Sequence, residues 1–169
     1  MSHGGFARNI FDMAAKKKIW KKGKGKLGLL EPLIGTWTAA AETPLGPVKC
    51  MRTFTKFHRD KWIMLDATWD FGGKFYKEHA IFGVDANGVV SFWSFTSDGK
   101  HSQGALSAAP DIHVEAVSFE AQMPAGLARM TYWPETEGTM NWAVESKTKK
   151  GWNRFAQHRY SKVAEVEES

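Results

Sequence analysis

Leu33-Ile34-Gly35-Thr36-Trp37-Thr38 divides the chain into two parts of different character. Before it the sequence is rich in lysine, and after it short apolar and aromatic runs alternate with Gly, Pro, Asn and Asp as far as Tyr160. A glycine lets the backbone bend where strands pack closely, and a tryptophan can fill one end of a barrel. We therefore interpret Gly35-Thr36-Trp37 as the entry into the first strand of a closed antiparallel β-barrel.

The chain beyond this point carries turn-forming segments at regular intervals, such as Asp85-Ala86-Asn87-Gly88 and Ser97-Asp98-Gly99-Lys100. Short strands at even spacing, with no helical stretch between them, indicate an all-β sandwich or barrel. Short loops favour an up-and-down meander, and closure removes its exposed edges. The sequence thus predicts a ten-stranded antiparallel barrel. The predicted strands are 34–42, 48–57, 62–70, 75–84, 89–96, 101–106, 112–122, 127–133, 139–146 and 152–161.

The charge divides the chain into three regions. Residues 1–30 carry eight basic side chains against Asp12 alone, whereas the rest of the 169-residue chain is slightly acidic, for a total of +5. We expect a basic N-terminal arm at 1–30, a barrel domain at 31–162 and an acidic tail at 163–169. Residues 6–22 lack proline and glycine and favour a helix with an imperfect apolar face, and 23–26 predicts a flexible break.

Three roles are open for this basic arm. It can dock across the barrel as a helix or remain a partly ordered tail. Its lysines, beside Phe and Trp, also have the chemistry of an anchor on an anionic membrane surface. Clustered positive charge is equally suited to nucleic acid, because neutralising phosphates requires charge alone. We also allow for a homodimer.

The composition limits compartment and chemistry. Cys50 is the single cysteine, so a disulfide framework is excluded, which fits a reducing compartment. No apolar run reaches the length of about 18 residues that a membrane span needs, and no secretory signal is apparent, so we expect a cytoplasmic protein. The six histidines lack the paired spacing of a zinc site, and no hydrolase elbow, phosphate loop or dinucleotide fingerprint occurs. A binding protein is therefore favoured over an enzyme.

Some polar residues stand within apolar strands and are candidate ligand contacts. Arg52 lies between Cys50 and Phe54 on one strand face, and Arg129 lies between Leu127 and Thr131 on another. An interior arginine must find an acceptor and can hold a ligand carboxylate or phosphate, whereas an outer one faces solvent. Both alternatives stay open.

Other candidates are a histidine and two tryptophans. His79 shares a strand face with Phe75, Lys77 and Ile81, which allows a position in the lumen or at the rim. Trp93 and Trp142 lie in strands and are suited to lining a cavity.

Several motifs resemble a known family. Leu33 to Trp37, Pro44 to Val48, Phe82 to Asp85, Arg129 to Thr131 and the Trp152 to Tyr160 strand look like an uncharacterised bacterial family of lipocalin-like barrels. That family is grouped with the heme-binding-like calycins, whose better-known members are the nitrobindins. The resemblance covers about residues 33 to 160.

The resemblance implies two contacts. Trp37 would pack against an arginine of the last strand, either Arg154 or Arg159. His158 resembles the histidine that binds heme iron in nitrobindins, which makes heme the implied cofactor. The last strand alternates so that Trp152, Arg154, Ala156, His158 and Tyr160 would share one face, and its inward side stays open.

The leading hypothesis is a barrel that binds a small hydrophobic or acidic molecule. Its ligand contacts would be Arg52, His79, Trp93, Arg129 and Trp142, with His158 as a heme ligand. The alternatives are a heme-dependent or isomerase-type enzyme on the same barrel, and an interaction protein acting through its basic arm.

Overall fold

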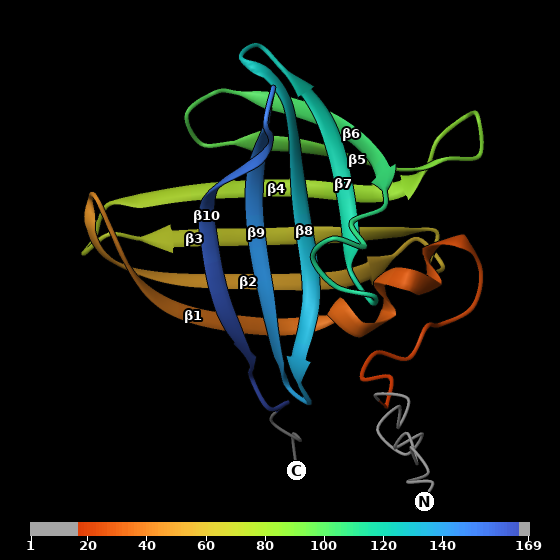
Figure 1. Cartoon of the computed structure of the whole chain (residues 1–169). Coiled ribbons are helices and arrows are strands. Elements are labelled where there is room, and N and C mark those ends of the chain that lie inside the picture. Colours follow the sequence, from red (N-terminus) through yellow and green to blue (C-terminus); the bar gives the residue numbers. More distant parts are fainter. Residues whose placement is uncertain (1–16, 166–169) are drawn as a thin grey trace, which may run out of the picture.

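A computed structural model describes residues 17–165 and shows a closed antiparallel β-barrel (Figure 1). Each strand pairs with its neighbour in sequence, and β1 pairs with β10 to close the barrel. The all-β up-and-down topology predicted from the sequence is confirmed. The strands are β1 Gly35–Thr43, β2 Gly46–Phe57, β3 Trp62–Asp70, β4 Phe75–Val84, β5 Val90–Thr96, β6 His101–Ser107, β7 Val117–Met123, β8 Gly126–Thr136, β9 Thr139–Thr148 and β10 Gly151–Lys162.

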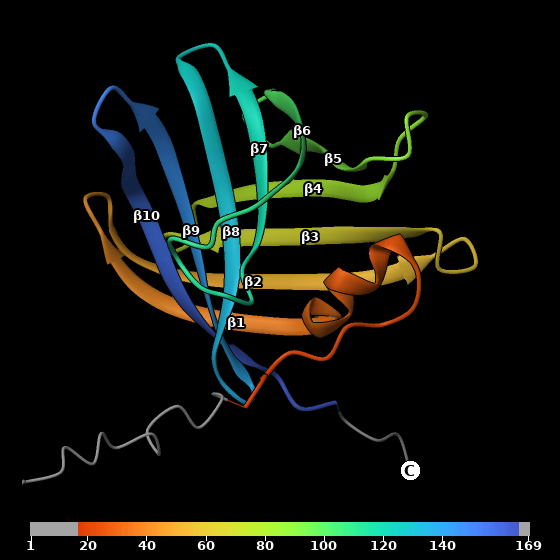
Figure 2. The same ribbon diagram turned by 45° about the vertical axis from the view of Figure 1, so that its right-hand side comes forward.

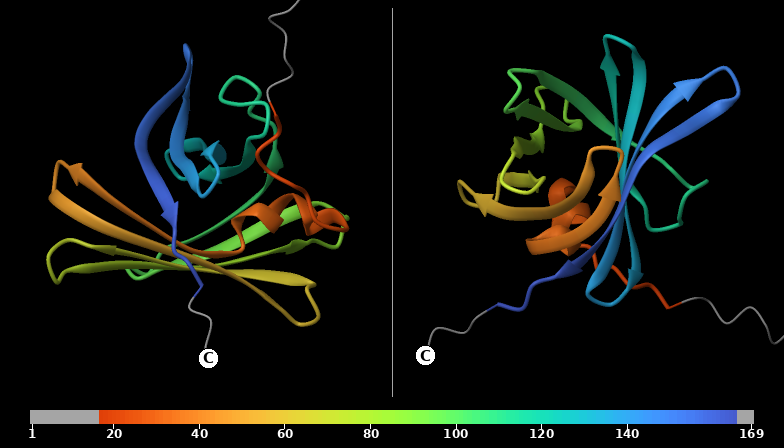
Figure 3. Two further views of the ribbon diagram at one scale, coloured as in Figure 1. Left: turned by 90° about the horizontal axis from the view of Figure 1, so that it is seen from below. Right: turned by 90° about the vertical axis from the view of Figure 1, so that its left-hand side faces the viewer.

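The strands of the barrel fall into two groups that cross each other. Strands β1 to β4 run across strands β7 to β10, and the two groups face each other across the core (Figures 1 and 3). β1 and β10 pair only at Trp37 and Thr38, opposite Lys162 and Ser161. Closure therefore depends on a short contact between the first and last strands.

One predicted strand begins late. The range 112–122 was expected to be extended, but β7 starts at Val117 and residues 108–116 form a loop that we call the strap. Its backbone turns on itself, since the amides of Ile112 and His113 both donate to the carbonyl of Ala109. The strap crosses the outer face of β7 and β8 (Figure 2). The apolar residues of the strap resemble a strand in sequence, but in the structure the strap covers the outer face of β7 and β8.

A 3₁₀ helix, η1, closes one end of the barrel (Figure 3). It spans Lys26–Leu33, and its Leu30 and Leu33 are fully buried. The indole Nε1 of Trp37 donates to the carbonyl of Leu33 at 2.9 Å, which ties η1 to the start of β1. Trp37 therefore fills this end of the barrel, as its position in the sequence suggested.

The predicted helical arm requires correction. Most of its range, residues 6–16, lies outside the described residues, and 17–22 is not helical. The predicted break at 23–26 leads into η1, because Gly25 has a φ of 73° that starts the turn. Residues 17–22 run along the strap instead. The amides of Ile19 and Trp20 donate to the carboxylate of Glu115 at 3.2 and 2.9 Å.

The predicted partner of Trp37 also differs. Its ring faces the ammonium of Lys162 at 5.5 Å, not a guanidinium. Arg154 lies over Trp133 and bonds Glu145, while Arg159 pairs with Glu135. The contact still joins the first and last strands, with a lysine at the position where the resemblance implied an arginine.

The inner faces of the strands form an aromatic core. Phe82 contacts Phe54, Phe92 and Phe119 at centroid distances of 5.2 to 6.2 Å, and Phe54 meets Tyr132 edge-on. Tilted and edge-to-face pairs of this kind add to the stabilisation from burial itself. Among the described residues, no helix is long and apolar enough to cross a membrane.

Replacing Leu30 by alanine tests whether η1 is part of the folded core. We expect a loss of roughly 2–5 kcal/mol in the free energy of unfolding, because a fully buried leucine leaves a cavity. Urea denaturation followed by tryptophan fluorescence measures it. Leu45→Ala is the matched control, since Leu45 is 82% exposed in the β1–β2 turn and should change stability by less than about 0.5 kcal/mol. Equal, small effects from both would show that η1 contributes little.

Candidate ligand-binding site

A cavity of about 310 Å³ occupies the barrel lumen toward the end opposite η1. Its lining comes from nine strands, β2 to β10, and includes residues close to the β3–β4, β5–β6 and β7–β8 turns. The walls are mainly aromatic and small apolar side chains. The largest of them are Trp69, Tyr76, Phe92, Phe119, Met130 and Trp142.

Arg52 lies at this cavity, on the inner face of β2. The strand alternates so that Val48, Cys50, Arg52 and Phe54 all point inward and are buried. The Arg52 side chain is 1% exposed. Its interior position confirms one of the two alternatives that the sequence left open.

Four aromatic rings surround the Arg52 guanidinium. Its Cζ lies 4.6 Å from the centroid of the Trp142 ring and 5.2, 5.7 and 5.8 Å from those of Trp69, Tyr132 and Tyr160. A cation over an aromatic face is attracted by the ring quadrupole, by about 2 kcal/mol where water is excluded. The rings thus stabilise a buried charge without neutralising it.

One carboxylate lies near this charge. Glu78 on β4 places Oε1 3.5 Å from Nη2 of Arg52, a long contact for an ion pair. Its other oxygen, Oε2, accepts a hydrogen bond of 2.7 Å from Ser94 on β5. Glu78 therefore balances the charge of Arg52 but satisfies little of its hydrogen-bonding capacity.

Several buried donors around Arg52 have no acceptor. Among the described residues, nothing accepts from Nε or Nη1 of Arg52, from Nε1 of Trp142 or from the hydroxyl of Tyr160. A buried polar group left unpaired costs about 1–3 kcal/mol, and more where it is charged. The donors around this one cation therefore keep hydrogen-bonding capacity that the described side chains do not use.

Burial and charge determine the protonation states here. Burial lowers the pKa of Arg52, but Tyr132, Tyr160 and Glu78 together raise it above its ordinary value, so the guanidinium stays charged. Burial raises the pKa values of Tyr132 and Tyr160, so both phenols are neutral at physiological pH. The interior around Arg52 therefore presents a fixed positive charge and two uncharged phenols, with the Glu78 carboxylate beside them.

His158 lies inside the barrel beside Cys50. Its Nδ1 is 3.5 Å from the Cys50 sulfur, and its ring packs against Trp142 with centroids 5.2 Å apart. Burial and the nearby charge of Arg52 lower the pKa of His158, while burial raises the pKa of Cys50. Both groups are therefore neutral at physiological pH. His158 is not among the residues that line the lumen cavity.

A β-bulge changes the face of the last strand. The pairing of β10 with β9 shifts between Arg154 and Ala156, so Phe155 is the extra residue. Before the bulge, Arg154 lies opposite Glu145 and points outward, whereas Ala156, His158 and Tyr160 lie opposite inward residues of β9. The expectation that Trp152, Arg154 and His158 share one face is therefore wrong. A bulge resets the two-residue period.

Arg129 is buried, but its side chain is directed to the outer wall. Arg129 is among the residues that line the cavity, but its neighbours Ala128 and Met130 point inward, so its side chain alternates to the other face of β8. It donates to Asp111 of the strap at 2.6 and 3.1 Å and to Glu145 at 2.7 Å, and it lies over the Trp152 ring. Its guanidinium is thus engaged in fastening the strap.

The structure places two other candidates away from the lumen. His79 is exposed on the outer face of β4, opposite Phe95. Trp93 alternates with the cavity residues Phe92 and Ser94, so it lies on the outer face of β5, where it contacts Trp62. Of the five predicted ligand contacts, Arg52 and Trp142 alone direct their side chains into the lumen.

Five residues of this site were missed from the sequence, and two of them are the rings Trp69 and Tyr132 at Arg52. Glu78 and Ser94 form the hydrogen-bonded pair beside Arg52, and Tyr160 is one of its four rings. The two-residue period of β4 was a signal for Glu78. It places Glu78 on the same face as Tyr76 and Ala80, and on the other face from His79. No three acidic, histidine or cysteine side chains among the described residues are grouped to hold a metal ion.

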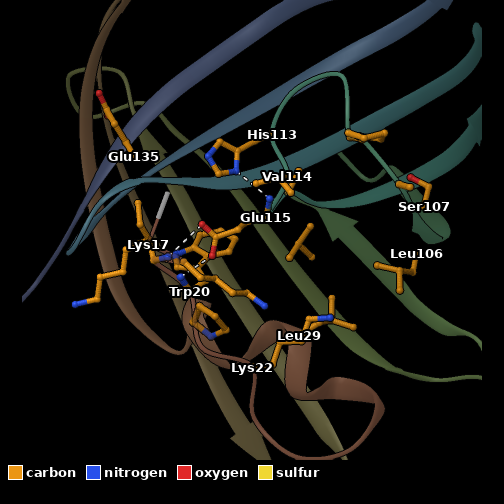
Figure 4. A pocket seen from close by; sticks show the side chains of 18 residues that line it. Lys17, Trp20, Lys22, Leu29, Leu106, Ser107, His113, Val114, Glu115 and Glu135 are labelled. Carbon is orange, nitrogen blue, oxygen red and sulfur yellow. Dashed lines mark hydrogen bonds between the residues drawn. The ribbon is translucent and has the colours of Figure 1, made fainter. Parts of the chain in front are cut away.

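A second hollow, of about 700 Å³, lies outside the barrel (Figure 4). It is lined by residues 17–22, η1 and the strap. Trp20 and Leu29 contribute apolar surface, and Lys17 and Lys22 stand at its margin (Figure 4). Membrane or nucleic-acid binding by the basic arm stays a prediction.

Comparison of the sequence with protein-family models and with curated proteins finds no match. The class of the protein is therefore defined by its fold and its site. It is a closed, ten-stranded, antiparallel up-and-down barrel, compatible with a calycin or lipocalin-like architecture, with a cavity in its lumen.

Asp111→Asn tests the attachment of the strap through the pH dependence of stability. Hydrogen bonds from Arg129 lower the pKa of Asp111, so the carboxylate stabilises the folded state above the unfolded value near pH 3.9. We expect the variant to be about 1 kcal/mol less stable at pH 7, because Asp111 is 57% exposed and screened. Urea titrations at several pH values should show this difference vanishing as pH falls through the lowered pKa of Asp111.

Asp66→Asn is the matched control for this experiment. Asp66 is exposed on β3 and forms no ion pair with any described residue. Its replacement should change stability little. A stability difference for Asp111→Asn that persists unchanged at low pH would contradict the ion-pair account.

Proposed function

We propose that this barrel binds one small, mostly apolar molecule in its lumen. The observation that carries the proposal is the lumen cavity of about 310 Å³ with aromatic walls. Small-molecule sites typically measure about 300–1,000 Å³ and combine apolar walls with a few polar groups. The cavity is therefore suited to a compact molecule of one or two rings.

The two ends of the barrel support this role. η1 and Trp37 fill one end, so that end offers no room. The cavity instead reaches Thr96, Lys100 and His101 around the β5–β6 turn. A ligand would enter between the hairpins of that end and leave by the same route.

The protonation state of Cys50, the nucleophilic side chain inside the barrel, favours binding over covalent catalysis. A reactive cysteine must be present as thiolate, which needs a lowered pKa. Burial raises the pKa of Cys50, and His158 beside it is neutral. The pair therefore supports packing rather than nucleophilic chemistry.

Heme binding through His158 stays a prediction. The His158 ring packs against Trp142 and lies beside Cys50, whereas the cavity is lined by other residues. This arrangement favours an organic ligand in the lumen over a porphyrin held by His158. An absorption titration with hemin, comparing wild type with His158→Ala, measures iron ligation directly.

Ala121→Phe tests the lumen as the binding site. Ala121 lines the cavity on β7, so a phenyl ring there occupies ligand space. With methyl 2-naphthoate as a neutral probe, isothermal titration calorimetry should show at least tenfold weaker binding to this variant. Ala40→Phe is the matched control, because Ala40 is exposed on β1 and its replacement should leave affinity unchanged. Equal affinity for both variants would contradict binding in the lumen.

A further inference from the structure

We infer that the lumen ligand is an acid, and that its carboxylate binds the Arg52 guanidinium inside the aromatic cage. This inference rests on the proposed binding function and specifies the class of ligand. It is carried by the unpaired donors around Arg52, which the apolar walls of the cavity do not explain.

The donors belong to one locus. Arg52 keeps Nε and Nη1 unpaired, and the rings of Trp142 and Tyr160, whose Nε1 and hydroxyl are also unpaired, lie 4.6 and 5.8 Å from its Cζ. These side chains come from β2, β9 and β10, and two of them, Arg52 and Trp142, also line the lumen cavity. The unpaired donors of Arg52, Trp142 and Tyr160 lack acceptor oxygens.

Glu78 does not fill this need. Its Oε1 stands 3.5 Å from Nη2 of Arg52, and its Oε2 is taken by Ser94 at 2.7 Å. A ligand carboxylate at the guanidinium can accept from N–H groups that Glu78 leaves unused. Because the guanidinium is a rigid planar donor, it suits the geometry of a carboxylate.

The surroundings also select the charge of the ligand. Arg52 is 1% exposed, so water screens its charge weakly, and a carboxylate that reaches its unpaired N–H groups is attracted although Glu78 lies 3.5 Å from Nη2. The aromatic side chains of Trp69 and Trp142 line the same cavity. The ligand class is therefore a compact, preferably planar, apolar carboxylic acid.

A matched pair of probes tests the inference: 2-naphthoate and its methyl ester. They share the bicyclic body and differ in the charged carboxylate. Isothermal titration calorimetry on the full chain at pH 7.5 should show at least tenfold tighter binding of the acid, since hydrogen bonds to charged groups are the strong ones. Equal or tighter binding of the ester would overturn the inference.

Three variants locate the effect. Arg52→Met should lower the affinity for the acid to that for the ester, with little change for the ester. Glu78→Gln keeps Arg52 and removes the carboxylate beside it, so this variant should bind the acid more tightly than wild type. It tests the role of Arg52 even if Arg52→Met fails to fold. Arg129→Met removes an equally buried arginine directed to the outer wall and should leave the preference for the acid unchanged.

The outcomes separate this inference from the proposed function. If wild type binds neither probe, the proposed lumen function fails with these probes, and the inference fails with it. If it binds both equally and Ala121→Phe abolishes both, the lumen function holds and the acid inference is overturned. A preference for the acid that survives Arg52→Met, or that disappears in Glu78→Gln, would also overturn it.

Discussion

The charge of Arg52 inside the barrel is the constraint on which the rest of the interior depends. A guanidinium does not lose its proton in a protein, so burying it requires compensation from its neighbours. Here the compensation comes from five other strands, through Trp69, Glu78, Tyr132, Trp142 and Tyr160. Each of these contacts crosses the lumen or joins neighbouring strands. The cage is thus formed only when the barrel closes.

Arg129 shows what a satisfied buried arginine looks like in the same protein. Its guanidinium bonds two carboxylates, Asp111 and Glu145, at 2.6 to 3.1 Å and stacks on an indole. Arg52, which is buried as deeply, keeps two unpaired nitrogens and one long contact. The two arginines therefore differ in role. The fully paired guanidinium of Arg129 holds the strap to the barrel, whereas the partly paired guanidinium of Arg52 keeps N–H groups free for a ligand.

Much of the barrel was predictable because its signals are local. Gly, Pro, Asn and Asp mark the turns, and the strands of 62–70 and 75–84 end where those residues stand. The strap was not predictable, since its apolar residues resemble a strand, whereas the bonds of Asp111 and Glu115 that hold it outside reach segments distant in sequence. The bulge at Phe155 was equally hidden, because a shift of register depends on the neighbouring strand.

The site was predictable only where its residues carry a local signal. Arg52 and Trp142 stand out as polar or aromatic residues within apolar strands, but alternation alone does not show which face is inward. The sequence therefore could not separate Arg52 from Arg129, or place His79 and Trp93 outside. Their sides are decided by the closing of the sheet, which is a property of all ten strands together.

The Nε–H resonance of Arg52 reports most directly whether its unpaired N–H groups bind a ligand acid. The measurement is a proton–nitrogen correlation spectrum of the arginine side chains, with the Arg52 signal assigned by its absence in Arg52→Met. We expect a slowly exchanging signal that moves on addition of 2-naphthoate and stays in place with the methyl ester. A signal that exchanges with water as fast as that of exposed Arg159, or that ignores a bound acid, would contradict acid binding at Arg52.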